Sequence, residues 1–104
     1  MSAIRLVLVD DEPLVLQGLR MVLGAEPGFE IVGEAGDGRA ALQLLRSTVP
    51  DIVLTDIRMP GMTGIELTRE IRTQPALADV VVVMLTTFAD DDCLVASARE
   101  GAAG

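Results

Sequence analysis

Residues 4–11 read IRLVLVDD, an apolar run that ends in two aspartates, and this stretch decides the fold. A run of leucine and β-branched residues, broken by a single arginine, suits a central parallel strand buried on both faces. A second run, residues 52–56 (IVLTD), also ends in an aspartate. Because ligands of open α/β sheets bind outside the carboxyl ends of the strands, we expect Asp10, Asp11 and Asp56 to meet at one rim of a sheet.

Three carboxylates at one rim repel one another. The repulsion amounts to roughly 4 kcal/mol for a pair of charges about 4 Å apart at an effective dielectric near 20. A divalent cation would remove this cost, and Mg²⁺ prefers a few carboxylates together with waters and phosphate oxygens. The aspartates therefore predict a metal site with one carboxylate left for chemistry.

The rest of the chain alternates short apolar runs with helical patterns, without an internal repeat or a linker. This order predicts a doubly wound parallel α/β sheet in which the first and third strands are neighbours. The helix start signals are a proline at position 13, Asp37 as an N-cap, and a capping box that begins at Thr63. We expect strands at 4–9, 29–34, 52–56 and 80–85, and helices at 13–24, 38–47, 63–73 and 90–99, with Val15, Leu19 and Val22 on one face of the first helix.

The amino-acid composition excludes several classes of function for this chain. The 104 residues suffice for one domain, half of them are apolar, and the net charge is −8. An acidic surface argues against nucleic acid binding by this chain itself. The chain has no histidine, which excludes Ser-His-Asp and Cys-His catalysis as well as histidine metal ligands. The single cysteine, Cys93, fits a reducing compartment, and no stretch predicts a membrane span or a signal peptide, so we expect a cytoplasmic protein.

The combined motifs resemble the receiver domain of two-component response regulators, with a flavodoxin-like fold and, in this chain, strand order 2-1-3-4. The match extends over the whole chain and is strongest with the NarL/FixJ-type subgroup, whose receivers precede a LuxR-type DNA-binding domain. The motifs are VLVDDEP (7–13), EIVGEAGDGRAAL (30–42), PDIVLTDIRMPGMTGIEL (50–67), LTTFADDD (85–92) and AREGAAG (98–104).

The resemblance implies roles for five residues. Asp56 would accept a phosphoryl group from a histidine kinase, and Thr86 would be the switch residue that binds this group. Asp11 and Asp56 would coordinate Mg²⁺ directly, Asp10 partly through water, and Arg58 through its backbone carbonyl. Such a domain is an enzyme only in that it catalyses its own phosphorylation and dephosphorylation.

Other interpretations stay open at this point. The acidic pair could cap the following helix, Asp56 could be a turn residue, and Thr86 could be an ordinary strand-end hydroxyl. Among functions, a Mg²⁺-dependent phosphohydrolase and a non-phosphorylated pseudo-receiver that acts as an interaction module both remain.

The sequence also departs from the family. It has no lysine, whereas the family carries one at the end of a fifth strand. We interpret residues 1–104 as a receiver domain that is incomplete at its C-terminus, without the fifth strand, the fifth helix or an output domain. The edge at Val80–Val83 would then be unpaired, which predicts self-association through that edge.

Overall fold

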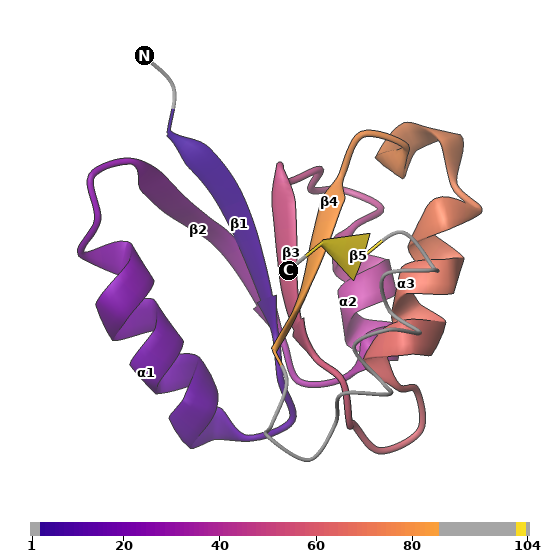
Figure 1. Ribbon diagram of the computed structural model, residues 1–104, viewed down its shortest axis with the longest axis horizontal. Helices are drawn as coiled ribbons and strands as arrows, with labels where there is room; N and C mark the ends of the chain where they lie inside the picture. The colour runs from indigo at the N-terminus through magenta and orange to yellow at the C-terminus, as the bar shows by residue number, and fades with distance from the viewer. Residues whose placement is uncertain (1–2, 86–101, 104) are drawn as a thin grey trace.

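The computed structural model describes residues 3–85 and 102–103 of the chain, which form one parallel sheet with helices on both faces (Figure 1). The strand order is β2-β1-β3-β4-β5, and every neighbouring pair is parallel. The predicted order 2-1-3-4 is therefore confirmed. The strands are β1 (Ile4–Val9), β2 (Phe29–Ala35), β3 (Ile52–Asp56), β4 (Val81–Leu85) and β5 (Ala102–Ala103).

Strand β5 corrects the expectation that this chain has no strand beyond the fourth. Its two residues pair in parallel with Val82 and Val83 of β4. Two alanines carry no alternation and have low β-propensity, so no sequence pattern could have revealed them. The expectation of a wholly unpaired β4 edge is wrong at these two positions.

The helices begin where the sequence signals place them. Helix α1 (Pro13–Gly24) has proline in its first turn, and helix α2 (Gly38–Leu44) is capped by Asp37, whose Oδ1 accepts from the amide of Ala40 at 2.7 Å. The capping box of helix α3 (Gly64–Arg72) is complete. In it, Thr63 Oγ1 accepts from the Glu66 amide at 3.1 Å, and Glu66 Oε1 accepts from the Thr63 amide at 3.0 Å.

Two details differ from the expectation. Helix α2 ends at Leu44 rather than near Ser47, because the amides of Arg46 and Ser47 bond the carbonyls three residues back and tighten the chain into a turn. A short 3-10 helix, η1 (Pro75–Leu77), follows α3 where only a break was expected. In the part of the chain that the structure describes, no helix is long and apolar enough to cross a membrane.

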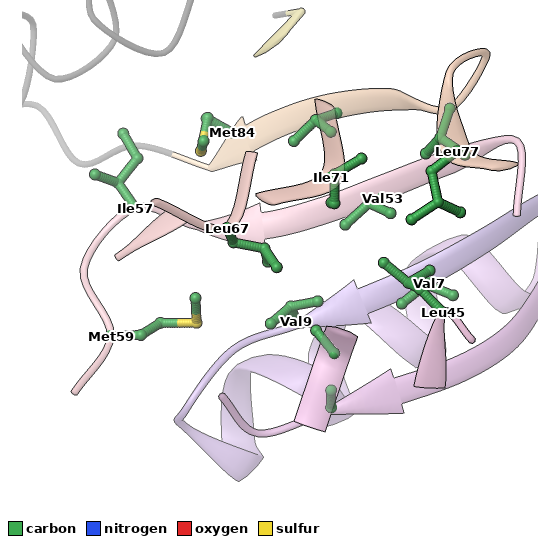
Figure 2. Packing of buried hydrophobic residues seen from close by; sticks show 14 residues of the cluster. Val7, Val9, Leu45, Val53, Ile57, Met59, Leu67, Ile71, Leu77 and Met84 are labelled. Carbon is green, nitrogen blue, oxygen red and sulfur yellow. The ribbon is translucent and has the colours of Figure 1, made fainter. Parts of the chain in front are cut away.

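The main core lies between the sheet and helices α2 and α3. Figure 2 shows Val7 and Val9 of β1 and Val53 of β3 on the side of the sheet that Leu67 and Ile71 of α3 cover, and all five are buried. The opposite face of the sheet carries α1, which contacts β2 and β1 (Figure 1). The described helices thus form a layer on each side of the sheet.

Helix α1 is less buried than its pattern suggested. None of its residues is buried in the described structure, and Val22, expected on the inner face, is 68% exposed. The helix is attached to β2 by an ion pair in which the Arg20 guanidinium donates two hydrogen bonds of 2.6 Å to Glu34. Helical spacing predicts that residues share a face, but only tertiary neighbours decide whether that face is covered.

The capping box of α3 offers a test of how the loop after β3 is held. Thr63→Ala removes the acceptor for the Glu66 amide and should lower the free energy of unfolding by about 1 kcal/mol. Thr63→Ser keeps the hydroxyl and should stay close to the unsubstituted protein. Urea unfolding followed by circular dichroism measures both, and equal losses in the two variants would contradict this account of the cap.

Candidate functional site

The structure brings Asp10, Asp11 and Asp56 together at the carboxyl ends of β1 and β3. Each offers a carboxylate oxygen, and these oxygens lie within 4.8 Å of one another. The cause is strand register: Val9 pairs with Thr55, so the residues that follow them emerge side by side. Asp10 is 4% exposed, Asp56 is half-buried and Asp11 is exposed, so the cluster runs from the interior to the surface.

Local hydrogen bonds orient Asp10. Its amide donates to the carbonyl of Ala35 at 3.1 Å, and its Oδ1 accepts from the amide of Glu12 at 2.9 Å. The N-cap residue of α1 is Glu12, and no side chain caps this helix. The interpretation of the acidic pair as helix caps therefore fails. Asp10 stabilises the turn ahead of the helix, which leaves its second oxygen and the Asp11 carboxylate available to the cluster.

The backbone around Asp56 is held from two sides. The buried Thr55 hydroxyl donates to the Asp56 carbonyl at 3.0 Å, and the Gly64 amide donates to the Ile57 carbonyl at 2.7 Å. Gly64 lies so close that a Cβ there would overlap the Asp56 carbonyl oxygen and come within 2.9 Å of Met84 Sδ. Only glycine fits this position, and the start of α3 is thereby packed directly against the end of β3.

The loop between these anchors makes a tight turn. Gly61 has a positive φ of 83°, a conformation that side chains disfavour, and the Met62 amide donates to the Pro60 carbonyl at 3.0 Å. Met59 of this loop is buried in the core (Figure 2). The chain after Asp56 is thus a defined structure rather than a loose connection.

The charges of the cluster change the acidity of Asp56. Its pKa is raised, first because partial burial disfavours the carboxylate, and then because Asp10 and, to a lesser degree, Asp11 add negative charge. The backbone amides of Ile57 and Arg58 donate hydrogen bonds to the carboxylate and partly oppose this rise. An added positive charge near Asp56 would stabilise its carboxylate and lower its pKa again.

The donor set fits a hard divalent cation. It consists of carboxylate oxygens alone, near enough to share one ion, and one side of the cluster is open to water. Mg²⁺ takes oxygen ligands and keeps several waters, which an open cluster of three carboxylates allows. The cluster's own repulsion adds to its affinity for a cation.

The other two predicted site residues have different outcomes. Arg58 is exposed and lies two positions after Asp56, and its backbone amide donates a hydrogen bond to the Asp56 carboxylate. Thr86 falls outside the described residues, directly after Leu85, which pairs with Asp56 in the register of β3 and β4. Sequence reasoning missed Thr55 and Gly64. The glycine between a capping threonine and an apolar helix face was a usable signal for Gly64.

Comparison with known proteins decides the family. The model of the response regulator receiver domain matches residues 6–104, almost the entire chain. The chain belongs to the response regulator receiver family.

Relatives of known sequence and structure agree with this assignment. The chain is 41% identical over 101 residues to the transcriptional regulatory protein YxjL of Bacillus subtilis, and 43% identical over 89 residues to the transcriptional regulatory protein LiaR of the same organism. These alignments cover 97% and 86% of the chain, but 45% and 41% of the relatives. The chain thus spans less than half the length of these two relatives.

A solved structure shows the same fold. The chain superposes on a two-component response regulator of the LuxR family from Aurantimonas sp. SI85-9A1 with a TM-score of 0.84 and 37% identity. The match covers 99% of this chain and 72% of that one. The receiver fold and the kinship with LuxR-type response regulators, both expected from the motifs, are confirmed.

The contact between Gly64 and Asp56 can be tested by adding a single methyl group. Gly64→Ala should lower the free energy of unfolding by about 1–3 kcal/mol, because the backbone at the end of β3 must move. Gly18→Ala is the matched control, since a Cβ there meets nothing within 4 Å on exposed helix α1. This control should be neutral or stabilising by about 0.5–1 kcal/mol. Urea midpoints compare the two, and equal effects would contradict the close packing at Gly64.

The raised pKa of Asp56 predicts how stability depends on pH without divalent ions. The folded state binds the proton of the Asp56 carboxyl more tightly than the unfolded chain does. Ionised Asp56 therefore lowers the free energy of unfolding when the pH is above the folded-state pKa. This loss disappears as the pH falls to the ordinary pKa of an aspartate. Asp56→Asn should therefore raise Tm at pH 7, by about 4–8 °C for each kcal/mol relieved. The gain should shrink on acidification. Thermal unfolding in EDTA across pH measures it, and a lower Tm for the variant at pH 7 would refute the repulsion.

Proposed function

We propose that this chain is the phosphoacceptor of a two-component system: Asp56 receives a phosphoryl group from a histidine kinase in a reaction that requires Mg²⁺. The observation that supports this most is the convergence of three carboxylates at the ends of β1 and β3, together with the raised pKa of Asp56. Kinship with transcriptional regulators supports the signalling context.

Asp10, Asp11 and Asp56 would hold the metal, joined by the backbone carbonyl of Arg58. When bound, Mg²⁺ would neutralise charge on the phosphoryl oxygens and lower the pKa of Asp56. Asp10 is fixed by the Glu12 amide and cannot turn away, so it presents one oxygen steadily to the cluster. Exposed Asp11 completes the cluster from the solvent side.

The transfer itself uses the Asp56 carboxylate as nucleophile. One of its oxygens bonds to phosphorus while the bond from phosphorus to the donor imidazole nitrogen breaks, and the imidazole takes a proton from water. The amides of Ile57 and Arg58 hold the carboxylate during the attack. Thr86 would supply a hydroxyl to the transferred group. Because the chain contains no lysine, we expect slow transfer in this chain.

In the intact protein this event would control an output. We propose a cytoplasmic regulator in which the receiver domain is joined to a DNA-binding domain. Support comes from relatives that are transcriptional regulators and more than twice as long as the matched region. Phosphorylation adds roughly −1.5 to −2 charges at the site, enough to bias two surface states that control dimerisation or the output domain.

Acetyl phosphate provides the direct test. With Mg²⁺, the protein should gain one phosphoryl group that hydroxylamine removes, and Asp56→Asn should abolish the adduct. The conservative variant Asp11→Asn should retain Asp56 but require much higher Mg²⁺. Intact-mass spectrometry measures the adduct.

Three outcomes separate the alternatives. An adduct that survives in Asp56→Asn would place the acceptor elsewhere. Multiple turnovers on small phosphoesters would favour a phosphohydrolase. If a version lengthened to a full receiver domain binds Mg²⁺ but never forms the adduct, the chain is a pseudo-receiver and the proposed transfer is wrong.

A further inference from the structure

Helix α2 and the turn that follows it carry a surface whose charge is opposite in sign to that of the chain as a whole. A single hollow of about 300 Å³ is lined by four residues at spacings of three, four and seven positions: Arg39, Leu42, Gln43 and Arg46. These four residues are here called the α2 stripe. The chain as a whole has a net charge of −8. A local positive surface on an acidic protein is therefore a feature to explain.

The two arginines of the stripe differ from the others in the described segments. Arg20 pairs with Glu34, the guanidinium groups of Arg5 and Arg72 donate to backbone carbonyls, and Arg58 and Arg69 also take part in interactions. Within residues 3–85, the side chains of Arg39 and Arg46 take part in neither a hydrogen bond nor an ion pair. The two free guanidinium groups thus border the same hollow.

The base of the stripe is rigid. Leu42 is half-buried and packs against the core, and neighbouring Ala41 and Leu45 are buried. Arg39 lies in the first turn of α2 and Arg46 in the turn that follows the helix, and both are exposed, with half-buried Leu42 between them in the sequence. A partner would therefore meet two positive side chains that extend from a packed backbone, with an apolar side chain between them.

We propose that the α2 stripe docks an acidic segment of another protein, with one carboxylate for Arg39, one for Arg46 and an apolar residue between them. This proposal does not depend on phosphorylation of Asp56. Charge complementarity favours such a partner over nucleic acid, which needs several phosphate contacts, whereas this surface offers two cations on a chain of net charge −8. A symmetric contact of two copies at the stripe would place arginines opposite arginines.

The stripe also adjoins the candidate functional site. Arg39 lines a second hollow of about 160 Å³, whose other lining includes Pro60, Gly61 and Met62 of the loop after β3. Met62 is packed so tightly on α2 that a Cβ on Gly38 would lie 2.6 Å from its Sδ. A docked segment that extends past Arg39 would meet the loop that follows Asp56.

The test uses a helical peptide of about 15 residues with two glutamates seven positions apart and a leucine between them. Added to the ¹⁵N-labelled chain, it should shift the side-chain Nε–H resonances of Arg39 and Arg46. The double variant Arg39→Gln/Arg46→Gln should raise Kd about tenfold. Raising salt from about 50 to 200 mM should weaken binding to the unsubstituted chain. A peptide with glutamines in place of the glutamates should not bind.

Controls make each outcome decisive. Arg39→Lys/Arg46→Lys keeps the charges and should retain part of the affinity, and Arg5→Gln removes a positive charge elsewhere and should change nothing. No binding, or equal binding by the glutamine double variant, would overturn the proposal. So would tighter, arginine-dependent binding of a single-stranded oligonucleotide, or dimers in light scattering that the glutamine double variant abolishes.

Discussion

The mutual repulsion of Asp10, Asp11 and Asp56 is the constraint around which this structure is arranged. Parallel pairing of Val9 with Thr55 brings the carboxylates together, and near-complete burial of Asp10 prevents water from dispersing its charge. Partial burial of Asp56 and, after it, the charges of Asp10 and Asp11 together raise the pKa of Asp56. A fold that keeps such a cluster gives up stability locally, which is typical of sites that bind cations or carry out chemistry. The surrounding hydrogen bonds hold the carboxylates against their own repulsion.

Much of the fold could be predicted from local signals. The bounds of β1 and β3 follow from apolar runs that end in aspartate, and α3 begins where its capping box begins. Asp10, Asp11 and Asp56 were identified because strand ends in a parallel sheet converge whatever the loops do. These inferences need only the spacing of apolar residues, the helix-capping residues and the direction of the strands. Each of these can be read from a few neighbouring residues.

The rest depends on neighbours that are distant in sequence. The helical pattern of α1 is real, but Val22 is exposed because its face has no described partner. Strand β5 exists only as a pairing with Val82 and Val83, since alanine itself favours no strand. The α2 stripe is visible in sequence as two arginines, yet their lack of partners could be seen only once the other arginines had been located. Tertiary context, rather than propensity, decided each case.

The junction of β3 and α3 determines which atoms of the site are free to respond. The Thr55 hydroxyl holds the Asp56 carbonyl, and the close approach of Gly64 leaves no space for that backbone to shift. A change of charge at Asp56 must therefore be accommodated by the carboxylate, by its amide donors or by the turn at Gly61. In this turn the Met62 amide donates to the Pro60 carbonyl. Because Met62 packs against the first residue of α2, a displacement of this turn would reach the base of the α2 stripe. The rigid junction of β3 and α3 keeps the carboxylates close together. For the same reason, a backbone movement caused by a change at Asp56 is confined to the turn at Gly61, which contacts α2 through Met62.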